Sequence, residues 1–169
     1  MSSTVSVQEV VVPMAGIGIG IGIGKDSAVL RTLLGSCVGI AFYDSKLKLA
    51  ALSHIVLPCS NGSEIMLGKY ADTAIPETIR QLQVLAGTRK LSLCVKIAGG
   101  ANMFAIKSSL NLTASIGNQN SEAVERILGS LQIPIIARDL GGTAGRKMVL
   151  YPGTGQVKIQ ILGQKEIEL

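Results

Sequence analysis

Short hydrophobic segments, separated by turns rich in glycine and proline, run along most of the chain. Several alternate apolar residues with small or polar ones, which is typical of strands that bury one face. This pattern predicts eight strands, over residues 5–12, 28–34, 37–43, 47–57, 91–97, 133–140, 146–151 and 156–162. The turn at 44–46 makes the third and fourth of them the arms of an antiparallel hairpin.

Two further segments have the period of amphipathic helices. In residues 69–86, Pro76 fits only the first turn, so we expect the helix to start near Thr73 and to end at Gly87. Residues 118–131 place their apolar side chains on one face.

Either of two asparagines, Asn118 or Asn120, is expected to cap the second helix. The tail, residues 163–169, is expected to be loose. Two helices among eight strands, with hairpins towards both ends, predict an α+β fold of mixed and antiparallel sheets.

Residues 16–24 strictly alternate isoleucine and glycine. A period of two places all the isoleucines on one face and only glycine on the other. As a strand, the segment has a bare face that another backbone can approach closely; as a loop, it is very flexible, and both readings stay open. It does not predict a phosphate-binding loop, because that motif ends in Gly-Lys-Ser/Thr and leads into a helix.

The composition narrows the class of protein. With 169 residues, 47% of them hydrophobic and 16% charged, the chain is expected to form one folded domain over residues 1–169. The net charge of +5 is spread without basic runs, and aromatic residues are only 3%, which disfavours a nucleic-acid surface. We expect no signal peptide, no membrane span and three reduced cysteines, hence a cytoplasmic protein.

Cys37 and His54 are the strongest candidates for chemistry. His54 is the only histidine of the chain. Cys37 lies eight residues before Ser45, and His54 lies eight residues after Lys46, so a tight turn at these two residues places the pair opposite one another at side-chain contact distance. A thiol beside an imidazole predicts a cysteine nucleophile with a general base.

A structural explanation competes with this one, since free cysteines are commonly core residues. If the thiol is activated, Cys37 should be alkylated faster than Cys59 near neutral pH. A third group is needed to orient the imidazole, and Thr32, Ser36 and Ser53 are all candidates. The turn at Gly35 and Ser36 offers backbone N–H groups to an oxyanion. The spacing of the cysteines and the histidine does not predict a metal site.

Six motifs occur in one order along the chain. They are Leu34-Gly35-Ser36-Cys37-Val38 with Tyr43-Asp44, His54 with Leu57-Pro58, Lys69-Tyr70-Ala71-Asp72, Lys96-Ile97-Ala98-Gly99-Gly100-Ala101, Ile116-Gly117-Asn118-Gln119-Asn120, and Asp139-Leu140-Gly141-Gly142-Thr143-Ala144-Gly145-Arg146-Lys147. Together they span about residues 28–162 and resemble the CheD family, the chemoreceptor glutamine deamidases of chemotaxis. The isoleucine–glycine segment, 16–24, is not part of this resemblance.

The resemblance implies a hydrolase that acts on side-chain amide C–N bonds and converts receptor glutamines to glutamate with release of ammonia. It implies Cys37 as the nucleophile, His54 as the general base and Thr32 as a third catalytic residue. Gly35 and Ser36, with the Gly99–Gly100 turn, are the weaker candidates for substrate binding or the oxyanion. No cofactor or metal is expected. The implied fold is an α/β sandwich related to a glutamine-deamidating toxin domain.

The implied partners are the cytoplasmic helices of chemoreceptors and, in organisms that have one, a CheC-type phosphatase. Methylesterase activity on receptor glutamyl esters has also been linked to the family, and the same acyl chemistry allows it. The alternative function is a non-catalytic adaptor that docks on receptors or on such a phosphatase. The presence of both Cys37 and His54 favours the enzyme.

Overall fold

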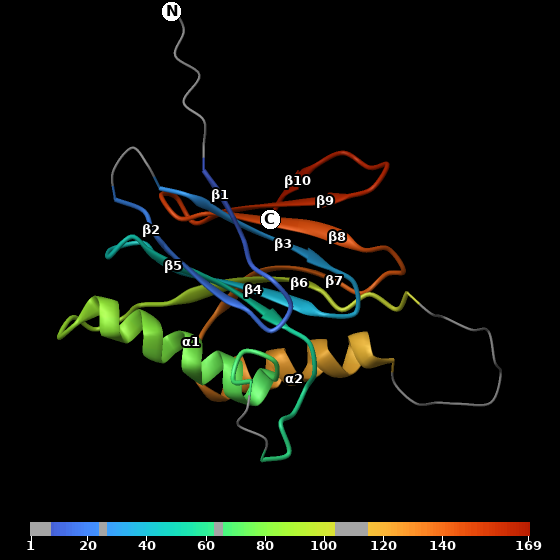
Figure 1. Ribbon diagram of the computed structural model, residues 1–169, viewed down its shortest axis with the longest axis horizontal. Helices are drawn as coiled ribbons and strands as arrows, with labels where there is room; N and C mark the ends of the chain where they lie inside the picture. Colours follow the sequence, from blue (N-terminus) through green and yellow to red (C-terminus); the bar gives the residue numbers. More distant parts are fainter. Residues whose placement is uncertain (1–7, 24–26, 63–65, 104–114) are drawn as a thin grey trace, which may run out of the picture.

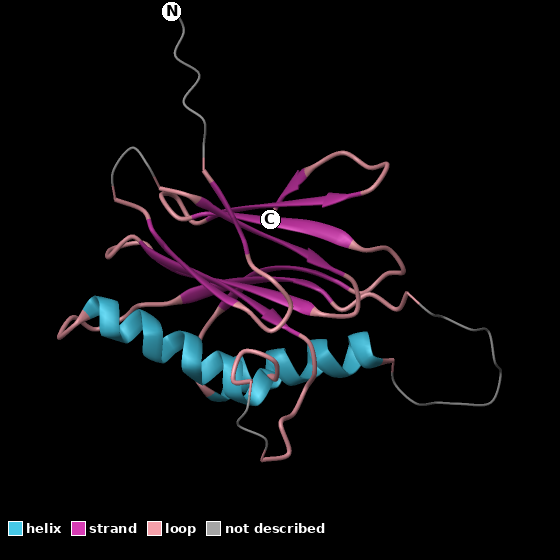
Figure 2. Cartoon of the chain, in the orientation of Figure 1, coloured by secondary structure: helices cyan, strands magenta, loops and turns pink. Residues whose placement is uncertain are grey.

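The strands form two stacked sheets, and both helices cover the outer face of one of them (Figures 1 and 2). The computed structural model describes residues 8–23, 27–62, 66–103 and 115–169. The first sheet has the order β1 (Glu9–Val11), β3 (Val29–Leu34), β8 (Arg146–Tyr151), β9 (Gln156–Ile161) and β10 (Ile167–Glu168). The second has the order β2 (Ile17–Ile21), β5 (Leu49–Ile55), β4 (Val38–Asp44), β6 (Cys94–Gly99) and β7 (Ile135–Leu140).

Both sheets are mixed. The pairs β1–β3 and β6–β7 are parallel, whereas the pairs around β4, β5, β8 and β9 are otherwise antiparallel. The helices are α1 (Ala71–Ala86) and α2 (Ile116–Ser130). The α+β prediction is therefore confirmed, with ten strands among the described residues in place of the eight expected.

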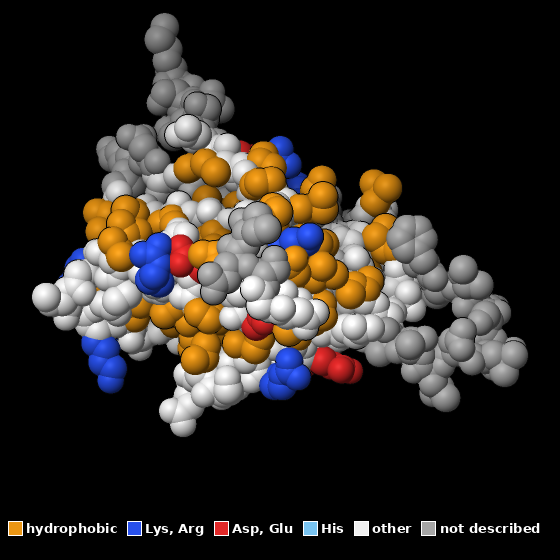
Figure 3. Space-filling model, turned by 60° about the horizontal axis from the view of Figure 1, so that its bottom comes forward, with side chains coloured by type: hydrophobic (Ala, Val, Ile, Leu, Met, Phe, Trp, Pro, Cys, Tyr) orange, Lys and Arg blue, Asp and Glu red, His pale blue; other side chains and the backbone are white. Residues whose placement is uncertain are grey.

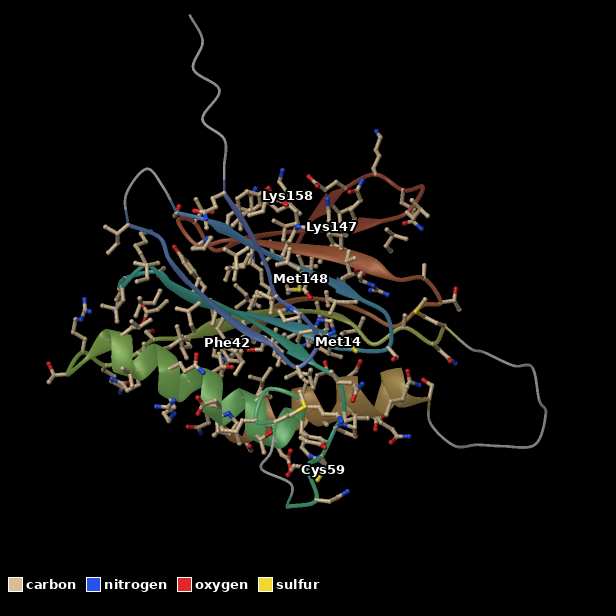
Figure 4. The ribbon with its side chains drawn as sticks, viewed as in Figure 1. Met14, Phe42, Cys59, Lys147, Met148 and Lys158 are labelled. Atoms are coloured by element: carbon tan, nitrogen blue, oxygen red, sulfur yellow. The ribbon has the colours of Figure 1, made fainter. Side chains whose placement is uncertain are left out.

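The second sheet lies between the helices and the first sheet, and it has a hydrophobic core on each of its two faces. Along β4, Val38, Ile40 and Phe42 pack towards the helices, and Ala41 and Tyr43 pack towards the first sheet. This is the alternation that a strand imposes on successive side chains. Every residue of β4 and of β5 is buried. In Figure 4, Phe42 lies on the helix side of the second sheet and Met148 lies between the sheets.

The isoleucine–glycine segment is the strand β2, which pairs antiparallel with β5. Its glycine face lies against residues of the first sheet. A Cβ atom added to Gly18 would collide with Val12, and one added to Gly20 or Gly22 would collide with Pro152. The bare face thus allows the two sheets to close together here. Residue 24, and residues 5–7 of the first predicted strand, lie outside the described residues.

Several boundaries differ from expectation, and three of the differences have a clear cause. Tyr70 forms an isolated β-bridge with Leu57, and the Ala71 N–H group donates to the Leu57 carbonyl. The helix α1 therefore begins at Ala71, and Pro76 lies in its second turn. Ser115 caps α2 by accepting a hydrogen bond from the Asn118 N–H group, so neither predicted asparagine is the cap. In the tail expected to be loose, Ile167 and Glu168 pair with β9.

The face that carries the helices is of mixed character. Figure 3 shows hydrophobic side chains on it, with Lys and Arg side chains scattered rather than gathered into one patch. Exposed Val84 and Leu131 line a shallow groove here together with Pro76 and Ile79. Within the described chain, no helix is long and apolar enough to cross a membrane.

Candidate active site

The candidate site lies where the chain crosses from one sheet to the other. Strand β3 belongs to the first sheet and β4 to the second, and residues 35–37 connect them (Figure 1). Thr32 on β3 and His54 on β5 both point into the layer between the sheets, where their side chains meet. Cys37 is the last residue of the crossing and packs at the edge of the same inter-sheet core.

A chain of two hydrogen bonds holds the His54 imidazole. The Thr32 hydroxyl donates to the Val12 carbonyl over 2.7 Å, and its oxygen lies 2.7 Å from Nδ1 of His54. A hydroxyl has one proton and a carbonyl can only accept. The Thr32 proton therefore goes to Val12, Nδ1 of His54 must be the donor to Thr32, and the lone pair of the neutral ring is on Nε2.

His54 is 3% exposed, and its Nε2 atom has no hydrogen-bond partner within the described residues. Burial lowers the pKa of this histidine below 6.5, although the nearby Val12 carbonyl acts in the opposite direction. The ring is therefore neutral at physiological pH. It presents a buried, unpaired basic nitrogen, which is the form that a general base requires.

The ladder does not place Cys37 directly opposite His54. The residue that pairs with His54 is Gly39, two positions beyond Cys37 along the chain. The predicted register is wrong because the hairpin loop has four residues, 45–48, instead of a tight turn. The Asp44 carboxylate accepts hydrogen bonds from the Lys46 and Leu47 N–H groups and so stabilises the longer loop.

Burial also affects the ionisation of the Cys37 thiol. Burial raises the pKa of the half-buried Cys37 thiol above 9.0, and the residue's own N–H group offsets this only in part. Burial thus favours the uncharged form of both Cys37 and His54. An attack by the Cys37 thiol therefore calls for a base that takes its proton.

The loop that carries Cys37 is fastened to the end of β6. Ala101 donates to the Gly35 carbonyl over 2.9 Å, and Gly100 donates to the Cys37 carbonyl over 2.8 Å. The Gly100 N–H group is therefore occupied and does not serve an oxyanion. Gly99 and Gly100 have φ values of 113° and 63°, and a Cβ atom on Gly99 would collide with the Cys37 carbonyl oxygen. These glycines shape the loop.

Two backbone donors remain at the predicted oxyanion turn. Within the described chain, the N–H groups of Ser36 and Cys37 donate to no other residue. Of the three candidates to orient the imidazole, only Thr32 contacts it. Ser53 is on the opposite face of β5, where its hydroxyl lies 2.7 Å from that of Thr78, and Ser36 has no hydrogen bond to the ring.

Sequence reasoning missed two groups at the site. One is the Val12 carbonyl, for which a side-chain pattern contains no signal. The other is Asn120, which is fully buried and donates to the Ser36 carbonyl over 3.0 Å and to the Val56 carbonyl over 2.9 Å. A signal was available for Asn120, because it shares the apolar face of the helix with Ala123 and Val124.

The other two cysteines lie apart from this arrangement. Cys59 is exposed on the loop labelled in Figure 4, and its thiol lies 3.3 Å from the Asp72 carboxylate. Cys94 is half-buried on β6 with its thiol 3.7 Å from the Tyr43 carbonyl. In the part of the chain that the structure describes, no three His, Cys, Asp or Glu residues are grouped so as to hold a metal ion.

Fold and site together define a two-sheet α+β domain with a buried, threonine-bound histidine between the sheets and a free thiol on the crossing from one sheet to the other. The family model described as "CheD chemotactic sensory transduction" matches residues 56–161. Two relatives are each named "Probable chemoreceptor glutamine deamidase CheD". The protein from Clostridium kluyveri is 42% identical over 156 residues, 90% of this chain and 95% of its own length. The protein from Clostridium botulinum strain Eklund 17B is 40% identical over 156 residues, which is 91% of this chain and 95% of its own length.

A third relative with the same name, from Clostridium acetobutylicum, is 36% identical over 165 residues, which is 96% of both chains. The chain belongs to the CheD family. The segment that the family model matches begins after Cys37 and His54, whereas the relatives align with at least nine-tenths of the chain.

Proposed function

We propose that this protein is a chemoreceptor glutamine deamidase that works through Cys37, His54 and Thr32. The names of its relatives supply the reaction and the substrate class. The observation that carries the assignment to these residues is the Val12–Thr32–His54 chain, because it leaves Nε2 of a buried neutral histidine free beside the crossing that carries the thiol. A histidine that serves only the core has no need of an unpaired nitrogen.

Acylation begins when Nε2 of His54 takes the Cys37 proton as Sγ attacks the carboxamide carbon of a receptor glutamine. The carbonyl oxygen becomes an oxyanion, and the N–H groups of Ser36 and Cys37 are its proposed donors. The tetrahedral intermediate collapses when His54 returns the proton to the amide nitrogen, which leaves as ammonia. The product of this half-reaction is a thioester between the glutamyl side chain and Cys37.

Deacylation repeats the sequence with water. His54 takes a proton from the water, the hydroxide adds to the thioester carbon, and the intermediate expels the Cys37 sulfur, which recovers the proton from His54. The sum is amide plus water giving carboxylic acid plus ammonia. Thr32 accepts the Nδ1–H bond of the imidazole, so each time the ring is neutral its lone pair is on Nε2, as with the orienting group of a catalytic triad.

The substrate proposed is the cytoplasmic part of a chemoreceptor, and the protein is proposed to act in the cytoplasm. The rival function is an adaptor that docks on receptors or on a CheC-type phosphatase without chemistry. Both functions predict binding to receptors. Only the enzyme changes the receptor covalently, so the product and not the complex decides between them.

The test incubates a purified receptor cytoplasmic fragment with the wild-type protein or with Cys37→Ala. Mass spectrometry of the digested receptor detects each conversion of glutamine to glutamate, and released ammonia is measured in parallel. We expect conversion by the wild type and none by Cys37→Ala, with Cys59→Ala retaining activity as the matched cysteine control. Equal product with wild type and Cys37→Ala would remove the proposed mechanism, and no product with either would favour the adaptor.

A further inference from the structure

The first turns of α2 pack directly on the loop that carries the candidate nucleophile. Gly117 touches the backbone of Gly100 and Ala101 so closely that an added Cβ atom would collide with their carbonyl oxygens. Asn120, one turn further along the helix, is 0% exposed and reaches the Ser36 carbonyl. The helix therefore supports the Cys37 loop in two ways. The Asn120 side chain contacts the loop directly, and the backbone of Gly117 packs on Gly100 and Ala101, whose N–H groups donate to the Cys37 and Gly35 carbonyls.

We propose that Asn120 is a positioning residue that aims and polarises the Cys37 N–H group as an oxyanion donor. The Ser36 carbonyl and the Cys37 N–H group belong to a single peptide unit. The described chain contains no cis peptide bond, so this unit is planar and trans, and its C=O and N–H bonds point in opposite directions. A hydrogen bond that fixes the carbonyl on the helix side therefore fixes the N–H group on the other side.

The same bond strengthens the donor. A hydrogen bond accepted by a peptide carbonyl polarises the whole unit and makes its N–H group a better donor, more so in a site of low dielectric. The Cys37 N–H group donates to no other residue of the described chain, so it is available for this role. The residue's own thiol is the group that attacks, which places this N–H group beside the carbonyl carbon under attack.

Asn120 also links the two halves of the site. Its second N–H bond is to the Val56 carbonyl, two residues beyond His54. Within the described residues it is the only side chain that donates to both the Cys37 loop and the segment that follows the histidine. Two carbonyl partners fix the orientation of the amide, because only its NH₂ group can serve them.

That orientation leaves the amide oxygen of Asn120 buried without a partner among the described residues. An unpaired buried acceptor destabilises a fold. A residue kept only for stability would not be expected to carry this penalty on a face otherwise shared with Ala123 and Val124. The two bonds donated to the site explain why a polar residue occupies this position.

The inference rests on the proposed deamidase function, and its test separates the two. Asn120→Leu keeps the size and burial of the side chain but removes both donors. We expect kcat for receptor deamidation to fall about 10- to 100-fold, somewhat less than the loss of an oxyanion donor altogether, with KM within about twofold. The rate of Cys37 alkylation by iodoacetamide should stay within about twofold of the wild type, because this displacement forms no oxyanion.

Thr78→Val is the matched control, since it removes a buried polar contact between the other helix and β5, on the face away from the site. It should lower the Tm and leave kcat unchanged at temperatures below the transition. If Asn120→Leu does not fold, Asn120→Ser, whose hydroxyl can donate to only one carbonyl, replaces it, and an intermediate loss of kcat is expected.

Three outcomes would overturn the inference. If the folded Asn120 variant has the kcat of the wild type, Asn120 does not position the oxyanion donor, and the proposed function is unaffected. A proportional fall in deamidation and alkylation shows that Asn120 acts on the thiol and not on the oxyanion donor. A wild-type protein that does not deamidate the receptor removes the proposed function itself, and the inference with it.

Discussion

At the scale of single residues, the use of one hydroxyl proton decides what His54 can do. Thr32 donates that proton to the Val12 carbonyl, so His54 must donate from Nδ1, and its Nε2 lone pair becomes the only free base in the inter-sheet layer of the described chain. The Val12 carbonyl thus acts on the imidazole through Thr32. A side chain without a hydroxyl at position 32 would lose this control of the tautomer.

Thr32→Val tests this control with little change of shape. The variant leaves the Val12 carbonyl and Nδ1 of His54 unpaired, and the ring can then carry its proton on Nε2. We expect kcat for deamidation to fall roughly 10- to 100-fold, a part of what a general base contributes. Thr32→Ser retains the hydroxyl and should keep most of the activity. Rates of Thr32→Val within twofold of the wild type would contradict the role of Thr32.

Residue types identified the thiol and the imidazole as candidates, because the chain has three cysteines and one histidine. They made Thr32 one of three residues that could orient the ring, and the family resemblance selected it. They did not give the relative positions. The hairpin count failed since the Asp44 side chain stabilises a four-residue loop, and the residue opposite His54 is Gly39, two positions from the expected Cys37. Asn120 was missed as a functional residue because asparagine in a helix suggests a cap, and here Ser115 performs that role.

At the scale of elements, β2 fits its place because one of its faces has no side chains. Its isoleucines lie on the side of the helices, where Ile19 packs against the outer core. Its glycines lie on the other side, against Val12 and Pro152. Residues just before β2 reach the site as well, since Ala15 donates to the His54 carbonyl and His54 donates to the Gly16 carbonyl. Close packing of β2 therefore also supports the backbone of the histidine.

Two glycine-to-alanine variants test this account of β2. In Gly20→Ala the added Cβ atom collides with Pro152, whereas Gly129 in α2 has nothing within 4 Å of an added Cβ atom. We expect Gly20→Ala to lower the free energy of unfolding by about 1–3 kcal/mol through overpacking. Gly129→Ala should raise it by about 0.5–1 kcal/mol through helix propensity. Urea denaturation measures both, and a neutral or stabilising Gly20→Ala would exclude close packing of this face.

The position of most elements followed from periodicity, because buried strands and amphipathic helices leave strong patterns. The strand β8, for example, has the bounds expected for residues 146–151. Element ends were less accessible. The start of α1 depends on the bridge between Leu57 and Tyr70, and β10 forms because Ile167 and Glu168 pair with β9. Both ends are therefore set by contacts between residues that are distant in sequence.

At the scale of the whole molecule, the site exists because consecutive strands belong to different sheets. Alternation along β3 shows that Thr32 shares a face with Leu30 and Leu34, but it does not show which sheet that face meets. The stacking of the first sheet on the second brings Thr32 to His54 across 22 positions of sequence. It also buries the only histidine of the chain between two hydrophobic layers.

This burial predicts a linked pH dependence of stability and activity. The folded protein holds the pKa of His54 below 6.5, whereas the unfolded chain does not. At a pH between the two values, the unfolded state binds the proton and the native state does not, so the free energy of unfolding rises with pH and falls on acidification below 6.5. Since His54 is the only histidine, His54→Gln should flatten this dependence between about pH 8 and about pH 5. Denaturation profiles over this pH range measure the dependence.

The same burial bears on activity. The acid limb of the pH profile of kcat/KM should have its midpoint below pH 6.5, because catalysis needs the neutral ring. Rate profiles measure this midpoint, and a value at or above pH 6.5 would mean that the base is not the buried imidazole.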